Sequence, residues 1–336
     1  MKNIRLGFKL VSVGALLILV PLAVLAFLAV TRSGASLSRL GKQQLLDRSR
    51  EIARIIDRVF LEESRLSLNL ANDPDIIQGT LDVDTKGVEK SADIVNEIYR
   101  KLSPFERNPE IHWTYEAAIV ADWNGRVFAA STVAWQGMSI AGAPYFTRAL
   151  SGTRNIGEVF FSKITNMPVV PIATPIFTAN SSQVVGVYVT LINIGFLTEI
   201  ISAEKIGKTG YAFVVDNKGE MIAHPKPQYI LKLNLLQDPG TKELGKQMTE
   251  GDSAIVPYVF EGLPVQAGIA PVETTGWSVA ICMYAADDVY VNTAGSLRNL
   301  FLIISGASLV LAFFIYVLFS RSITVPLSRG VAFAQA

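Results

Sequence analysis

The stretch YEAAIVADWNGRVFAAS, residues 115–131, is an apolar run, a polar turn and a second apolar run. Asn-Gly at 124–125 supplies the positive φ angles of a two-residue hairpin turn, so the pattern predicts strand, turn and strand. The stretch GYAFVVDNKGEMIAHP, residues 210–225, repeats it, with Asp216 and Gly219 each 94 positions after Asp122 and Gly125. We interpret the two stretches as copies of one small α/β unit, the alternative being that all hairpins look alike.

Further segments repeat in the same order after each hairpin. Residues 168–176, PVVPIATPI, match residues 263–272, LPVQAGIAPV, and each is followed by a predicted last strand, at 184–192 and 277–283. The order strengthens the interpretation as a repeat, because unrelated hairpins would not share their downstream segments.

Helical patterns precede the first hairpin. Residues 33–72 contain no proline, and five apolar residues recur at helical spacing: Ile52, Ile56, Val59, Leu66 and Leu70. We expect one long helix that ends at Asp73-Pro74; the alternative is two shorter helices broken near Gly41. Residues 86–103 predict a second helix, stopped by Pro104.

Two uncharged segments predict membrane spans. Residues 10–30 and 300–319 contain no Asp, Glu, Lys or Arg, and about 20 residues of helix match the thickness of a hydrocarbon core. The alternatives are a cleaved signal peptide for the first segment and a buried core helix for the second. Basic residues before the first span and after the second favour cytoplasmic termini, although three basic residues also come directly after the first span. Residues 31–299 then form one extracytoplasmic region.

Composition excludes several functional classes. A net charge of +1 gives no basic surplus for nucleic acid, and one cysteine allows neither an internal disulfide nor a cysteine zinc cluster. The two histidines are too far apart for a helical metal pair, and no glycine-rich phosphate loop lies at a strand-to-helix junction. We therefore expect no catalytic residues, no metal site and no cofactor.

The organisation resembles the double Cache sensor domain, a tandem PAS-like module of bacterial transmembrane receptors. The most specific segments are PYFTRALSG at 144–152, KITNMPVVPIATPI at 163–176, and IGKTGYAFVVD at 206–216 followed by IAHP at 222–225. The resemblance implies an α+β fold in which two transmembrane helices flank a long helix and two lobes with antiparallel sheets. The membrane-distal lobe would cover residues 73–200 and the membrane-proximal lobe residues 201–288.

Residues 322–327, SITVPL, are similar to the opening of a HAMP linker, and we expect the chain to stop inside that domain, with its output domain missing. Receptors of this plan include methyl-accepting chemotaxis proteins, sensor histidine kinases and cyclic-di-nucleotide enzymes. The layout most resembles a chemoreceptor of the cytoplasmic (inner) membrane. The alternatives are a kinase or cyclase sensor and a membrane anchor that binds nothing.

The resemblance also places the ligand in the membrane-distal lobe, near the helix start at Pro144. Amino-acid-binding members carry an Arg, a Trp and an Asp where this sequence has Ala143, Tyr145 and Leu191, so no charge pair remains for a zwitterion. We therefore expect a small anionic or neutral ligand such as a carboxylate. The candidate ligand-binding residues are two cations, five aromatic residues and two threonines: Arg148, Lys163, Tyr115, Trp135, Tyr145, Phe146, Phe161, Thr174 and Thr190. Solvent exposure is the alternative role of the cations, and core packing that of Tyr145 and Phe161.

Four other conspicuous residues have structural interpretations. Asp122 and Asp216 precede turns, where an Asp side chain accepts hydrogen bonds from the following backbone. His224 and Cys282 are interpreted as a structural residue and a small buried apolar residue. The expected mechanism is signal transmission: ligand closes the distal lobe, and a displaced second span biases HAMP. The expected partners are a small-molecule ligand, membrane lipid, a second copy of the chain and cytoplasmic signalling proteins, with no nucleic acid.

Overall fold

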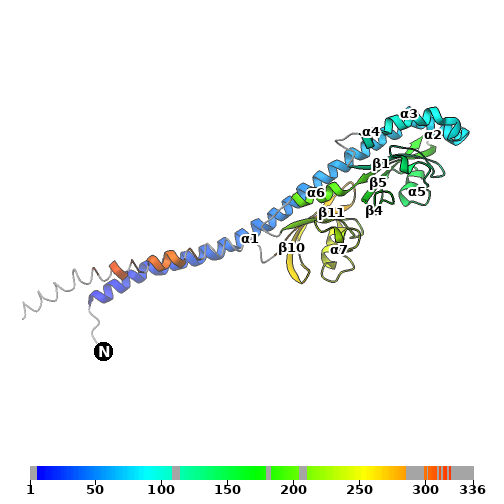
Figure 1. Ribbon diagram of the computed structural model, residues 1–336. Helices are drawn as coiled ribbons and strands as arrows, with labels where there is room; N and C mark the ends of the chain where they lie inside the picture. The colour runs from blue at the N-terminus through cyan, green and yellow to red at the C-terminus, as the bar shows by residue number, and fades with distance from the viewer. Residues whose placement is uncertain are drawn as a thin grey trace, which may run out of the picture. The chain divides into compact units, whose positions relative to one another are not determined.

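The computed structural model describes residues 6–107, 114–178, 183–203 and 210–284, together with short helical pieces between 299 and 318. The chain divides into two compact units, one formed by residues 44–286 and the other by residues 1–43 and 287–336. Figure 1 shows the helices and strands and labels some of them. Two β-sheets and the helices that cover them make up the unit of residues 44–286.

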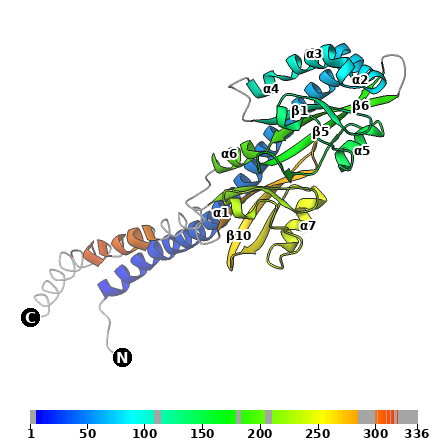
Figure 2. The same cartoon turned by 45° about the vertical axis from the view of Figure 1, so that its right-hand side comes forward.

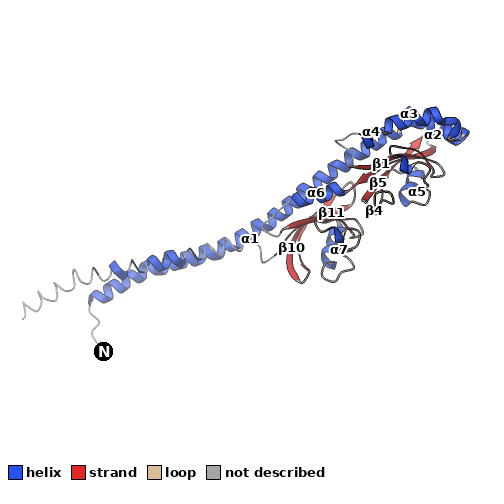
Figure 3. Cartoon of the chain, viewed as in Figure 1, coloured by secondary structure: helices blue, strands red, loops and turns tan. Residues whose placement is uncertain are grey.

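Both sheets are antiparallel and share one strand order. Figure 3 shows their strands in red. The first sheet has the order β2-β1-β6-β5-β3, with β4 also on β5, and the second has the order β8-β7-β11-β10-β9. Hairpin β1–β2 therefore corresponds to β7–β8, and β6–β5 to β11–β10. The predicted α+β class with two antiparallel sheets is confirmed. The first sheet is formed by β1 (Tyr115–Asp122), β2 (Val127–Ala130), β3 (Asn155–Ile156), β4 (Phe160–Phe161), β5 (Pro168–Phe177) and β6 (Val184–Asn193), and the second by β7 (Tyr211–Val215), β8 (Met221–Ala223), β9 (Ala254–Phe260), β10 (Leu263–Val272) and β11 (Trp277–Tyr284).

Helix α1 (Leu6–Ala71) is continuous past Gly41, so the predicted long helix is present and the alternative of two shorter helices is wrong. Its residues from 44 onward run beside both sheets (Figures 1 and 2). The side chains of Ile52 and Ile56 are buried in a core that includes Val170 of β5 and Val214 of β7. One face of α1 thus holds the two sheets through a shared apolar core.

The helical region after α1 differs from the sequence-based expectation. Helix α2 (Pro74–Lys86) was not predicted, and the helix expected at 86–103 begins later, as α3 (Ala92–Leu102) after the short 3₁₀ turn η1 (Glu89–Ser91). Asp73-Pro74 ends α1 but also begins α2: the Asp73 carboxylate accepts from two backbone N–H groups, and Pro74 occupies the first helical position. Proline suits that position because its missing N–H has no partner there anyway.

The β1–β2 turn is one residue longer than predicted, and the β7–β8 turn has the same form. The Gly125 N–H donates to the Asp122 carbonyl at 2.9 Å, and the Gly219 N–H donates to the Asp216 carbonyl at 3.1 Å. Only the glycine of each turn has a positive φ, which makes a type I turn followed by a left-handed glycine, not a two-residue turn. The aspartates accept backbone N–H groups of their own turns, as their structural interpretation predicted.

The remaining short elements are α4 (Pro104–Arg107), η2 (Val133–Trp135), α5 (Pro144–Leu150), α6 (Gly195–Ala203), η3 (Pro227–Tyr229) and α7 (Lys242–Glu250). Within the described part of the chain, none of the helices has both the length and the apolar character needed to cross a bilayer. The spans at 10–30 and 300–319 stay predictions. The candidate HAMP segment at 322–327 lies outside the described residues.

Candidate functional site

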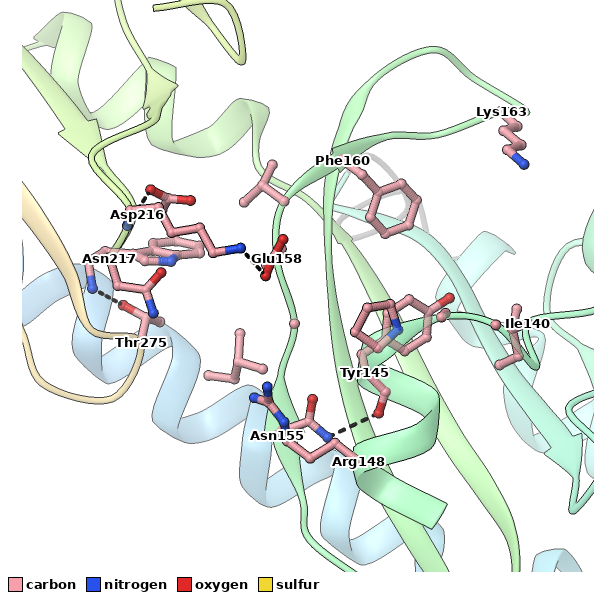
Figure 4. A pocket seen from close by; sticks show the side chains of 18 of the residues that line it. Ile140, Tyr145, Arg148, Asn155, Glu158, Phe160, Lys163, Asp216, Asn217 and Thr275 are labelled. Carbon is pink, nitrogen blue, oxygen red and sulfur yellow. Dashed lines mark hydrogen bonds and ion pairs between the residues drawn. The ribbon is translucent and has the colours of Figure 1, made fainter. Parts of the chain in front are cut away.

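A pocket of about 640 Å³ lies beside the first sheet and reaches the second (Figure 4). The first-sheet side of its wall comes from η2, α5 and the whole run 155–160. The opposite side comes from residues 216–218, in the β7–β8 turn, and from Thr275 and Trp277 at the β10–β11 turn. Side chains from both halves of the repeat therefore face one cavity.

The β1–β2 turn holds one part of this wall in place. The Val127 N–H donates to the Met138 carbonyl at 2.9 Å, and the Ile140 N–H donates to the Gly125 carbonyl at 2.8 Å. Met138 and Ile140 both line the pocket. A Cβ at Gly125 would stand 2.6 Å from the backbone of Ala141, so this turn requires glycine for space as well as for its φ of +80°.

Aromatic rings form the apolar part of the wall. The rings of Tyr145 and Phe160 are stacked, with centroids 6.3 Å apart and an interplanar angle of 3°. Burial raises the pKa of Tyr145 to about 12, so its hydroxyl stays protonated at physiological pH and can donate a hydrogen bond. The ring of Trp135 is buried at the same wall.

Two buried polar atoms at the pocket have no hydrogen-bond partner in the described part of the chain. They are the indole N–H of Trp135 and the side-chain Oδ1 of Asn155. The Asn155 amide nitrogen donates to the Tyr145 carbonyl at 3.1 Å, which orients that side chain. An unpartnered buried polar group costs free energy, and both of these groups belong to residues that line the pocket.

Charged side chains lie on opposite sides of the pocket. Arg148 and Lys163 line it and form no ion pair within the described residues. Lys218 instead pairs with Glu158 at 2.5 Å, and the Asp216 carboxylate accepts the N–H groups of Lys218 and Glu220, each at 2.8 Å. Figure 4 shows Asp216 and Asn217 across the pocket from Tyr145 and Phe160. The free cations therefore belong to the first-sheet side.

The structure brings four of the nine candidate residues into this pocket: Trp135, Tyr145, Arg148 and Lys163. The other five do not line it. Phe146 is buried in the core, and Phe161 is 41% exposed outside the pocket. The Tyr115 hydroxyl donates to Glu63 at 2.7 Å.

The two threonines are also engaged elsewhere. The Thr174 hydroxyl is bonded to that of Ser67 at 2.7 Å, and the Thr190 hydroxyl donates to that of Tyr188 at 3.2 Å. Both threonines are buried. Strand alternation explains why these threonines do not line the pocket. Successive side chains of a strand point to opposite faces of the sheet, and the threonines lie on the face toward α1.

Sequence reasoning missed Asn155, Glu158, Asn217 and Trp277 as pocket residues. Asn155 and Glu158 lie in a run whose strands are only two residues long, too short for a sequence pattern to show. The second-sheet residues were missed because the ligand was expected in one lobe alone. The repeat offered a signal, since the turn at 216–219 was already recognised.

The sequence model of the Cache domain family matches residues 33–290 of this chain. The chain belongs to the Cache domain family. Beyond this match, the methyl-accepting chemotaxis protein McpA of Bacillus subtilis (strain 168) is 24% identical over 321 residues, which cover 94% of this chain and 44% of McpA. The chain thus spans less than half the length of this curated relative.

Solved structures of two other proteins share the fold. The ligand-binding domain of Mlp24 with asparagine has a TM-score of 0.56 at 13% identity and covers 78% of this chain and 99% of that domain. The extracellular domain of the inferred histidine kinase mmHK1S-Z2 has a TM-score of 0.57 at 16% identity. The match covers 74% of this chain and 99% of that domain. At these identities the likeness shows the fold of a double Cache domain and nothing more specific.

Proposed function

We propose that this chain is the ligand-sensing and membrane-anchored part of a bacterial chemoreceptor, and that it binds a small organic carboxylate in the pocket beside the first sheet. The observation that carries the proposal is the set of unengaged groups there. Arg148 and Lys163 line the pocket, and neither has an ion-pair partner within the described residues. A guanidinium fits a carboxylate through two parallel hydrogen bonds.

Two positions that bind an amino acid in related receptors carry no charge in this chain. Leu191, which occupies the expected position of an ammonium-binding Asp, is fully buried and apolar. Ala143, at the expected position of a carboxylate-binding Arg, has a methyl side chain. These two positions therefore offer no charge to a zwitterion, and the cations available are Arg148 and Lys163.

The proposed activity is transmission of a signal without a chemical reaction. The spans at 10–30 and 300–319 would place residues 31–299 outside the cytoplasmic membrane and would carry a helix displacement to a HAMP segment beginning near 322. A ligand shifts such a balance only through its different affinities for the two states, and a tenfold preference corresponds to about 1.4 kcal/mol. A homodimer and cytoplasmic signalling proteins complete the proposed pathway.

The test is a ligand screen on the complete 336-residue chain in detergent micelles, read by its thermal unfolding temperature. Ligand at 100 times its dissociation constant adds about 2.7 kcal/mol to the free energy of unfolding, which gives a clear shift. Arg148→Ala should weaken binding of a carboxylate hit at least about tenfold. Arg154→Ala is the matched control: that guanidinium donates to the Ser64 carbonyl, and Arg154 does not line the pocket.

A second candidate, favoured by the fold shared with mmHK1S-Z2, is the same sensor attached to a histidine kinase. Both outputs would use the same pocket, so ligand binding cannot separate them. Fusing the chain to a chemoreceptor signalling domain and to a kinase domain, and comparing the ligand response of each, would show which output it controls.

A further inference from the structure

The second sheet contributes a further cation to the pocket, beyond Arg148 and Lys163. Lys218 lines the pocket from the β7–β8 turn. Its backbone position is set by the turn, since its N–H donates to Asp216 Oδ1 at 2.8 Å and its carbonyl accepts from the Asn234 amide at 3.0 Å. The turn thus presents the lysine side chain to the cavity from a defined point.

Glu158 is the partner of this lysine and comes from the other sheet. It lies between β3 and β4, in the run 155–160 whose six residues all line the pocket. The Glu158–Lys218 pair, at 2.5 Å, therefore links the first-sheet wall to the second-sheet wall. Hydrogen bonding to Glu158 raises the pKa of the Lys218 ammonium, which stays charged.

The Glu158–Lys218 pair can be replaced by a competing anion. Its side chains are 63% and 59% exposed, and exposed pairs of this kind are weak because water screens them. A carboxylate that entered the pocket would compete with the Glu158 carboxylate for the Lys218 ammonium. Asp216 and Glu220 also lie near Lys218, and the first of these is held by the backbone of its own turn.

We propose that the pocket takes a dicarboxylate, with one carboxylate at Arg148 and the other at Lys218, where it replaces the carboxylate of Glu158. This inference rests on the proposed carboxylate-sensing function and adds the ligand class and a contact from the second sheet. Glu158 then acts as a built-in competitor that occupies the cation while the pocket is empty. When the ligand binds, the direct Glu158–Lys218 contact between the sheets is replaced by contacts through the ligand. Both lobes therefore contact the bound ligand.

The experiment measures dissociation constants of succinate and butyrate, which have the same number of carbons but two carboxylates and one carboxylate, respectively. Titration calorimetry on the complete chain in detergent compares wild type, Lys218→Gln, Glu158→Gln and the double variant. Succinate should bind wild type at least about tenfold more tightly than butyrate, and Lys218→Gln should remove most of that difference. Glu158→Gln should tighten succinate binding about threefold or more, because the competitor is gone.

The double variant separates direct contact from a long-range field. If Lys218 binds the ligand, Glu158→Gln gives no gain in the Lys218→Gln background. An equal gain in both backgrounds would overturn the proposal, because it would show only a change in local potential. Glu250→Gln and Lys246→Gln, an exposed pair on α7 that does not line the pocket, should leave both constants unchanged.

The remaining outcomes distinguish failure of the dicarboxylate inference from failure of the proposed carboxylate-sensing function. If Arg148→Ala abolishes binding while Lys218→Gln and Glu158→Gln change nothing, the dicarboxylate inference fails and the carboxylate function stands. Tighter binding in Lys218→Gln would also overturn the inference, since the ligand would then present a cation to this side. If neither compound nor any other carboxylate binds any variant, both proposals fail.

Discussion

Gly125 controls the pocket wall at the scale of a single residue. Replacing it with alanine forces a φ of +80° on an L-residue and places a Cβ 2.6 Å from the backbone of Ala141. We expect Gly125→Ala to lower the free energy of unfolding by about 3 kcal/mol, from the strain of the left-handed backbone and from overpacking. Gly137→Ala is the matched control, because its φ is +79° but its Cβ would meet open space. We expect it to lower the free energy of unfolding by only about 1 kcal/mol. Equal losses in urea unfolding would show that the contact with Ala141 is unimportant.

His224 is a second single residue with a measurable effect, because it makes the free energy of unfolding depend on pH. Burial lowers its pKa from 6.5 to about 4, and its Nδ1 accepts the Lys226 N–H at 2.9 Å. Because the unfolded chain takes up the proton first, this contribution to stability is present above pH 6.5 and is lost as the pH falls toward 4. Between about pH 7.5 and pH 5 the loss should be about 2 kcal/mol. His224→Gln should have a correspondingly shallower pH slope, and an identical slope would contradict the assignment.

The contact between α1 and β5 is the element-scale feature that fixes the first sheet on the long helix. The Ser67 and Thr174 hydroxyls bond to each other at 2.7 Å, and both residues are buried. Thr174→Val should cost about 1–3 kcal/mol in free energy of unfolding, because it leaves the Ser67 hydroxyl unsatisfied. Adding Ser67→Ala should recover much of that loss. A double variant whose loss equals the sum of the two single losses would show that the hydroxyls are not coupled.

Elements with a strong local signal were predictable, and those set by tertiary contacts were not. The β1–β2 and β7–β8 hairpins are predicted by apolar runs around a turn, and α1 is predicted by its helical stripe. The stripe did not identify its buried members: Ile52 and Ile56 are buried, whereas Leu66 is 37% exposed. The pocket was predicted in part, because α5 and its Arg148 carry a recognisable motif. Glu158 and Lys218 come together only through packing of the two lobes, which no local pattern encodes.

The membrane arrangement belongs to the scale of the whole molecule. If residues 31–299 lie outside the cytoplasmic membrane, a cysteine at Lys90, which is exposed, should react with a membrane-impermeant maleimide on intact spheroplasts. A cysteine at Asn3 should react only after permeabilisation. Both variants are made in a Cys282→Ala background, although Cys282 is fully buried. Labelling of the Asn3 variant on intact spheroplasts would contradict the proposed topology.

The central claim is that a small carboxylate binds at the free cations of the first-sheet wall. The most direct measurement is the affinity of a panel of carboxylates and amino acids for the complete chain, with wild type and Arg148→Ala compared side by side. We predict saturable binding of one or more carboxylates, weakened at least about tenfold by Arg148→Ala and unchanged by Arg154→Ala. Binding of amino acids alone, or a carboxylate affinity that is the same in Arg148→Ala, would contradict this claim.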